Sequence, residues 1–244
     1  MQNKITSFIK KLELRKGDHI IIHGNLGFIA QIDQKKDIKI LIKLFFKEIK
    51  KRIGIKGVVL VPAFTYNFCN NRISTIKDIS EVGQFSEMVR KIFNKRTIHP
   101  IFSFTVIGDH KAYKDSSRHE CFGNDSIFEK FMKNKGKIIC LGSGFDTITF
   151  VHHIEEMFKV KYRKYKIFNG LLKIHKKRQK ISVRYFVRKN KKIKNNFINF
   201  EKNLKKKKKI IYLNFLRFNA LKVKAKDLFQ EGMKSLELNP NFLI

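Results

Sequence analysis

A histidine and a glutamate three residues apart, His152 and Glu155, are the pair in this chain best suited to proton transfer. Residues three apart on a helix share one face, so a helix here would bring the imidazole beside the carboxylate. A carboxylate in that place holds one tautomer of the ring and stabilises its protonated form, which makes the imidazole a general base. A helix start with a surface His and Glu has the same spacing, so the pair alone leaves both interpretations open.

The adjacent His153 and Glu156 raise the alternative of a metal site. They lie about one residue further round the helix than the first pair, so all four side chains cannot face one ion. The sequence also lacks an HExxH pattern, a P-loop and a GxSxG elbow, which argues against metallopeptidase, nucleotide-hydrolase and serine-hydrolase chemistry. We therefore expect no metal.

The segment before His152 is predicted to position it. The apolar run 137–141 predicts a buried strand, and a glycine-containing polar turn then leads into the helix. Apolar strands are also expected at 19–23 and 57–62, with a helix over 34–52 between them. A strand–helix–strand order of this kind begins an α/β sheet, in which ligands bind at the carboxyl ends of the strands.

The rest of the chain continues this pattern and then changes character. Ser126 and Glu129 are spaced as a capping box for the helix that follows them. Further helices are expected over 4–14, 85–93, 127–132 and 225–233, a loop at 24–27, a strand at 103–108, antiparallel strands within 162–167, 181–187, 210–213 and 221–223, and a lysine-rich helix or loop over 196–209. The predicted fold class is α/β, with a mixed-sheet core, flanking helices and an antiparallel C-terminal β portion. We expect one domain over 1–244, with 160–244 as its antiparallel, substrate-side part.

The formal charge of +34 over 244 residues first suggests a nucleic-acid partner. Lys, Ile, Asn and Phe are all abundant, however, and their codons are A/T-rich, so a biased genome would also load lysine onto tolerant surface. The densest block, Lys205–Lys209, has no aromatic residue on which a base could stack. We expect no specific nucleic acid, but a surface that concentrates small anionic ligands in a salt-dependent way.

Cysteine usage and hydropathy indicate the compartment. Cys69, Cys121 and Cys140 form no CxxC pair and no disulfide framework, which suits a reducing environment. The N-terminus has no apolar h-region, and no apolar stretch approaches the roughly 20 residues of a membrane span. The sequence thus predicts a cytoplasmic protein without a membrane span.

Six short motifs follow one another along the chain. They are Gly17-Asp18 with a strand ending in His23, VPAFTYNF at 61–68, Val82-Gly83 before a helix, RTIHPIFSF at 96–104, FGNDS at 122–126, and LGSGFDTITFVH at 141–152 completed by Glu155. Together and in this order they resemble the aminoglycoside (antibiotic) N-acetyltransferase family, the coenzyme A-dependent group unrelated to the GNAT fold. The resemblance covers residues 10–160 well and the remainder weakly.

The resemblance implies a function and a set of site residues. It makes His152 the general base and Glu155 its carboxylate partner, and it implies direct transfer of an acetyl group from acetyl-CoA to an amine. Tyr66, Asp146 and Thr149 would lie near the acceptor amine. The residues expected along coenzyme A are His23, Gly24, Asn25, Leu26, His99, Ser103, Phe104, Phe122 and Gly123. From the residues alone, His23 and His99 are equally well explained as a polar strand end and a turn that bonds its own backbone.

The sequence departs from the family pattern in ways that bear on the acceptor. Gly24-Asn25 stands where the family has Ser-Ser, Phe102 where it often has His, and Ile148 where it often has Asn. With 20 acidic against 54 basic residues, the chain is poorly suited to a polycationic aminoglycoside. We expect an amino sugar, nucleotide-linked or from a surface-polysaccharide pathway, as the acceptor.

Two alternatives to an N-acetyltransferase that acts on an amino sugar or, as in antibiotic resistance, an aminoglycoside stay open at this point. One is a basic nucleic-acid-binding protein, and the other is a non-catalytic member of the family, because three motif positions have changed. The sequence does not fix the oligomeric state, and a homodimer is compatible with it.

Overall fold

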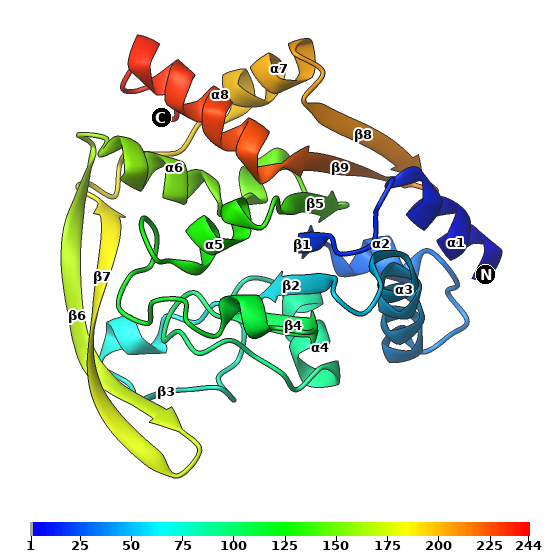
Figure 1. Ribbon diagram of the computed structural model, residues 1–244, viewed down its shortest axis with the longest axis horizontal. Helices are drawn as coiled ribbons and strands as arrows, with labels where there is room; N and C mark the ends of the chain where they lie inside the picture. Colours follow the sequence, from blue (N-terminus) through cyan, green and yellow to red (C-terminus); the bar gives the residue numbers. More distant parts are fainter. Residues whose placement is uncertain (1) are drawn as a thin grey trace.

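A six-stranded mixed sheet forms the centre of the computed structural model, which describes residues 2–244 (Figure 1). Its strand order is β4-β2-β1-β5-β9-β8. β1 lies parallel to β2 and β5, whereas β4 and β9 run antiparallel to their neighbours β2 and β5. The strands are β1 (His19–Gly24), β2 (Val58–Pro62), β4 (Phe104–Gly108), β5 (Lys137–Leu141), β8 (Ile210–Phe215) and β9 (Phe218–Lys224).

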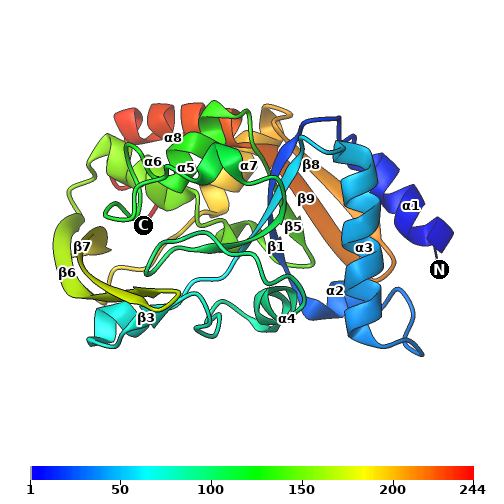
Figure 2. The ribbon, with the colours of Figure 1, turned by 60° about the horizontal axis from the view of Figure 1, so that its bottom comes forward.

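Helices cover both faces of this sheet because its central strands are apolar on both sides (Figure 2). Ile20 and Ile22 pack with α1, α2, α3 and α4, whereas Ile21, between them, packs with α5, α6, α7 and α8. The helices are α1 (Gln2–Lys11), α2 (Leu26–Ala30), α3 (Ile38–Ile53), α4 (Gln84–Ile92), α5 (Ile127–Lys133), α6 (Val151–Phe158), α7 (Ile198–Lys206) and α8 (Ala225–Leu238), with short 3₁₀ turns η1 (Asn67–Asn70), η2 (Lys111–Tyr113) and η3 (Phe145–Thr147). No helix within 2–244 has the length and apolar character needed to cross a membrane.

A second, three-stranded sheet stands at one end of the molecule (Figure 1). It consists of the long antiparallel hairpin β6 (Arg163–Ile174) and β7 (Lys177–Arg188), with the two-residue β3 (Ser74–Thr75) parallel to β6. The first residue of β6, Arg163, follows α6 closely, so the hairpin starts beside the helix that carries His152.

The predicted mixed α/β architecture is confirmed, with two local corrections. The loop expected at 24–27 is wrong, because α2 begins there, capped by Asn25, whose Oδ1 accepts the Gly27 N–H at 2.8 Å. The capping box of α5 is half formed. Ser126 Oγ accepts the Glu129 N–H at 3.3 Å, but Glu129 itself accepts from the N–H of Asp125, at 2.8 Å.

Candidate functional site

A tight turn at the carboxyl end of β5 delivers α6 to the edge of the sheet. Gly142 follows the strand with φ of 65°, and a Cβ there would meet the Phe218 ring at 2.9 Å. The left-handed backbone and the close ring both require glycine. The chain then passes through η3, and α6 begins at Val151. His152 therefore lies in the first turn of a helix anchored directly to the central strand.

His152 and Glu155 form a hydrogen bond across one turn of α6. His152 Nδ1 lies 2.5 Å from Glu155 Oε2, and the glutamate side chain is fully buried. Tyr162 donates its hydroxyl to Glu155 Oε1 at 2.9 Å, and Arg163 Nη2 lies 2.9 Å from Oε2. Both oxygens of the buried carboxylate thus have partners, and its negative charge faces a buried guanidinium.

This geometry selects the tautomer of His152. A carboxylate accepts and does not donate, so Nδ1 carries the hydrogen that points to Glu155. Arg163 Nη2 also lies 3.1 Å from Nδ1, but two hydrogen-bearing nitrogens cannot bond each other, so the guanidinium donates to Glu155 instead. Nε2 is then the free acceptor of the ring, which is the state required of a base.

Glu155 is held in its charged form despite its burial. Burial alone raises the pKa of Glu155, but the His152 hydrogen bond, the charges of His152 and Arg163, and the Tyr162 hydroxyl outweigh it, so the pKa is lowered. A permanently ionised carboxylate is what stabilises an imidazolium formed during a reaction.

A cavity of about 370 Å³ opens at His152. It is bounded on one side by Tyr66, from the loop after β2, and on the other by β7 and the segment that follows it. Among the described residues that line it, three are cationic and none is acidic. They are Tyr66, His152, Arg163, Tyr185, Val187, Arg188, Lys191 and Asn195.

The β1–α2 segment expected along coenzyme A lies at the same edge of the sheet as α6. His23 and Gly24 pair with Cys140 and Leu141 at the end of β5, and the Asn25 N–H donates to the Leu141 carbonyl at 2.8 Å. Burial lowers the pKa of His23 to about 4, so the ring is neutral. Gly24 packs against Phe85, where a Cβ would come within 2.9 Å of the ring. Contact with coenzyme A stays a prediction for His23, Gly24, Asn25 and Leu26.

His99 is engaged by its own backbone. Its Nδ1 accepts the N–H groups of Ile101 and Phe102 at 3.0 and 2.9 Å, and burial lowers its pKa to about 4. Ser103 bridges the side chain of Arg96 and the carbonyl of Ala63. These bonds fix the loop before β4 at the same edge of the sheet. Contact with coenzyme A stays a prediction for His99 and Ser103.

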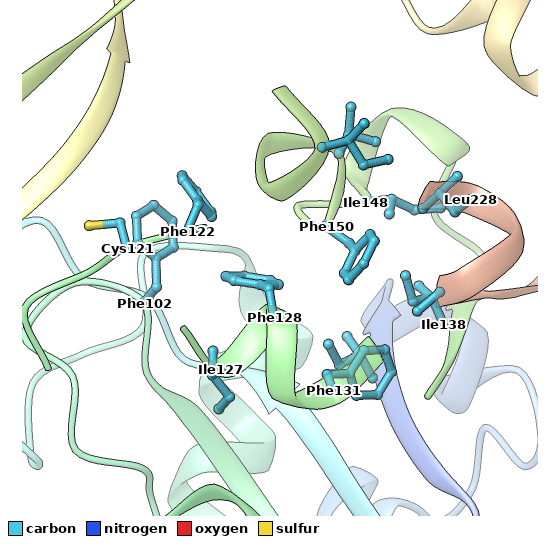
Figure 3. Close-up of a cluster of buried hydrophobic side chains, with 14 of the residues drawn as sticks. Phe102, Cys121, Phe122, Ile127, Phe128, Phe131, Ile138, Ile148, Phe150 and Leu228 are labelled. Atoms are coloured by element: carbon cyan, nitrogen blue, oxygen red, sulfur yellow. The ribbon is translucent and has the colours of Figure 1, made fainter. Parts of the chain in front are cut away.

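Phe122 reaches the site, whereas Phe104 lies in the core. The Phe122 ring meets His152 edge-on with centroids 5.5 Å apart, and Gly123, at φ of 73°, donates its N–H to His153 Nδ1 at 3.2 Å. Phe104 packs against Phe64 and Phe128. Phe102, Phe122, Phe128 and Phe150 lie close together in this part of the core (Figure 3).

The three residues expected near the acceptor lie in different places in the structure. Tyr66 lines the cavity with His152, whereas Asp146 is exposed in η3 and Thr149 contributes its carbonyl to the His152 N–H at 3.0 Å. Ile148 is buried in the core near Phe150 (Figure 3), so it does not face the cavity directly. No group of three His, Cys, Asp or Glu side chains within 2–244 is arranged to hold a metal ion.

Sequence reasoning missed Tyr162 and Arg163, the two further partners of Glu155. A buried carboxylate needs a cation or several donors, so Glu155 implies such partners. In the structure α6 ends at Phe158, and the left-handed Lys159 after it turns the chain back so that Tyr162 and Arg163 lie beside Glu155. Among 54 Lys and Arg residues, however, nothing in the sequence marks Arg163 as the one that turns inward.

Comparison with known proteins gives one consistent result. The family model for aminoglycoside 3-N-acetyltransferase matches residues 45–237, more than three quarters of the chain. The search of curated sequences finds no match. Among solved structures, AAC-IIIb in a binary complex with CoASH superposes with a TM-score of 0.79 at 17% identity, over 98% of this chain and 96% of that one. Sisomicin-bound AAC-VIa gives 0.80 at 15%, over 97% of each chain, and the YokD protein from Bacillus subtilis gives 0.78 at 16%, over 100% and 95%.

Proposed function

The chain belongs to the aminoglycoside 3-N-acetyltransferase family, which comprises acetyl-CoA-dependent acyltransferases, and from this premise we propose that it acetylates an anionic amino sugar with His152 as general base. The single observation that carries the proposed base is the His152–Glu155 hydrogen bond, 2.5 Å long, with the carboxylate fully buried. That AAC-IIIb binds CoASH and AAC-VIa binds sisomicin supports a site for a donor and an acceptor in the same fold.

In the proposed reaction the acceptor amine attacks the thioester carbonyl of acetyl-CoA. His152 Nε2 takes a proton from the attacking nitrogen, the carbon–sulfur bond breaks, and the imidazolium passes that proton to the departing thiolate, so that coenzyme A leaves as the free thiol and the ring is neutral again. Glu155 holds the ring by Nδ1 and offsets the charge that the ring gains. A backbone N–H in the loops at the strand ends would bind the developing oxyanion. Holding both substrates together supplies much of the acceleration.

The proposed acceptor follows from the charge of the cavity at His152. Arg188 and Lys191 line it without a carboxylate among the lining residues, whereas the charge of Arg163 is offset by Glu155 behind it. A polycationic aminoglycoside would be repelled there, whereas an amino sugar that carries a phosphate would be attracted.

The test of the base is His152→Ala, measured by thiol release from acetyl-CoA. We expect a loss of roughly 10²–10⁴-fold in kcat, with unchanged thermal stabilisation by coenzyme A, which reports binding. His175→Asn, an exposed histidine in the turn of the β6–β7 hairpin, serves as the matched control and should keep full activity. Near-normal turnover of His152→Ala would remove the assignment of the base.

The test of the acceptor class compares an amino sugar, its phosphate ester and sisomicin. We expect the phosphate ester to have the highest kcat/KM, and Arg188→Glu with Lys191→Glu to raise its KM about tenfold without changing the KM for acetyl-CoA. A rise in the acetyl-CoA KM instead would mean that these cations serve the donor, and a preference for sisomicin would overturn the proposed acceptor.

A further inference from the structure

A second cavity, of about 1210 Å³ against about 370 Å³ at His152, lies at the opposite end of β5. Four segments far apart in the chain form it: the loop between α1 and β1, the turn between α5 and β5, the turn between α7 and β8, and the junction of β9 with α8. β5 begins in this cavity at Lys137 and ends, at Leu141, in the turn that leads to His152. The cavity is therefore separated from the acetyl-transfer site by the length of a central strand.

The lining of this cavity is strongly cationic. Nine of its 18 lining residues are Lys or Arg and three are Asp or Glu. Met132, Ile211 and Phe229 supply apolar surface beside the charges. Most of these cations are exposed side chains, whereas Lys137 and Lys209 are partly buried and Lys222 is buried.

Three of the lysines come from one face of the sheet. Lys137 on β5 lies directly opposite Lys224 on β9, and Lys222 is two residues before it on the same face. Like charges directly opposite each other destabilise an antiparallel pair. Lys222 is only 8% exposed, and its burial lowers its pKa.

Carboxylates offset two of these three lysines but leave Lys224 without a partner within residues 2–244. Lys137 pairs with Asp18 at 2.5 Å, and Lys222 lies 3.4 Å from Glu13 and donates to the Leu12 carbonyl at 2.8 Å. Lys224 has no ion pair within residues 2–244. The sheet thus presents a cation to the cavity with nothing in the described chain to offset it.

The start of α8 adds to this excess of positive charge. Lys224 occupies the N-cap position, no side chain caps the helix, and Asp227 is the one acidic residue of the first turn. A helix N-terminus carries a partial positive charge and favours an anion. A lysine in place of Ser, Thr, Asp or Asn at that position adds charge of the unfavourable sign.

We propose that this cavity binds a ligand carrying several phosphate groups, of about the size of a nucleotide. The phosphates would lie between Lys224, the start of α8 and the lysines of β5 and β9, where they would offset the unpaired charge of Lys224. The apolar surface of Met132, Ile211 and Phe229 would cover an uncharged part of the ligand. This site is independent of acetyl transfer at His152.

The experiment measures binding of tripolyphosphate by calorimetry to three forms of the full chain. In the first variant, Lys224→Glu with Lys226→Glu removes cations at the cavity, and both changes suit a helix N-terminus, so folding should be retained. In the control, Lys43→Glu with Lys47→Glu changes the net charge equally on the exposed face of α3. We expect binding to weaken at least tenfold in the first variant and less than twofold in the control, with acetyl transfer unaffected in both.

Other results would overturn the proposal. Equal weakening in the two variants would assign binding to the overall charge, and displacement of tripolyphosphate by coenzyme A would assign it to the donor site. If tripolyphosphate does not bind, the protein has no site for a small polyphosphate. The same conclusion holds if a long RNA binds to the protein while tripolyphosphate does not.

Discussion

Arg163 carries the positive charge that makes a buried Glu155 tolerable beside His152. An ionised carboxylate with no exposed area is costly without a compensating cation, and Arg163 Nη2 lies 2.9 Å from Glu155 Oε2. With the guanidinium in place the carboxylate stays ionised, so it can offset the charge that the imidazole gains during the reaction. Arg163 is thus a positioning residue, because it acts through Glu155.

Replacement of Arg163 by Met tests this role. Loss of the cation leaves Glu155 to favour a protonated ring, so a higher pH is needed to free the base. We expect the rising limb of the pH–rate profile to move up by about one unit, while kcat at high pH recovers part of its value. Arg163→Lys should return the limb toward its original position. A uniform loss of activity with an unmoved limb would indicate a structural role alone.

Glu156 follows Glu155 in the sequence, but folding raises its pKa where it lowers that of Glu155. Burial, with Glu120 nearby, raises the pKa of Glu156 to about 7, and its Oε2 is buried without a partner within residues 2–244. A carboxyl whose pKa is raised on folding stabilises the protein below its unfolded pKa of about 4.5, and this stability is lost as the pH rises through about 7.

Glu156→Gln is therefore expected to stabilise the protein at alkaline pH. The amide carries no charge to desolvate, so the variant should gain about 2 kcal/mol over the original chain at pH 8.5 and little at pH 5. Calorimetric unfolding at the two pH values measures this difference. Glu237→Gln, an exposed position on α8, should show no such dependence, and equal behaviour of the two variants would contradict the argument.

The turn between β5 and η3 determines where α6 starts, and Gly142 makes this turn possible. Gly142→Ala would add both left-handed strain and a contact with Phe218 at 2.9 Å, which together should cost about 2–4 kcal/mol. Gly17→Ala separates the two effects. Gly17 has φ of 84° with nothing within 4 Å of a Cβ, so only the strain, about 1–2 kcal/mol, applies. Chemical denaturation measures both, and equal losses would exclude the ring contact as a cause.

The elements that the sequence predicted well are those whose signal is local. β1, β2 and β5 are short apolar runs because both of their faces are buried, and the helices α3, α4 and α8 have one apolar stripe each. The hairpin was recognised but its length was not. Ile167 in its inner half is 63% exposed, whereas Leu172, nearer the turn, is buried, so no regular burial pattern marks where β6 ends.

Some contacts of the candidate site follow from local spacing in the sequence, and others depend on how distant segments pack together. The contact between His152 and Glu155 follows from helical spacing, and the structure contains it. The cavity wall from β7 and the segment after it depends on how the hairpin folds back over α6. Tyr185 and Arg188 lie more than 30 residues beyond His152, and no periodicity in the sequence links them to it. Side chains that meet through tertiary packing leave no spacing to be recognised.

On the scale of the whole molecule, the net charge of +34 should raise the rate at which anionic substrates associate with the protein. Two explanations of the lysine content differ in what they predict. If the positive field attracts acetyl-CoA, screening must slow its capture, because the Debye length falls from about 10 Å at 0.1 M salt to about 3 Å at 1 M. If the lysines are only a consequence of codon composition, their field is incidental, and capture will depend on contacts within the site that salt screens much less.

We expect the first behaviour, because a net charge of +34 gives the whole surface a positive potential that attracts the phosphates of acetyl-CoA before it contacts any one residue. Between 0.1 and 1 M potassium chloride, kcat/KM for acetyl-CoA should fall roughly tenfold while kcat stays constant, since steering changes association and not the bound complex. Equal osmolarity of sucrose in place of salt should leave kcat/KM unchanged apart from viscosity. A flat salt profile would show that the charge contributes nothing to capture of the donor, and a parallel fall in kcat would place the effect within the bound complex instead.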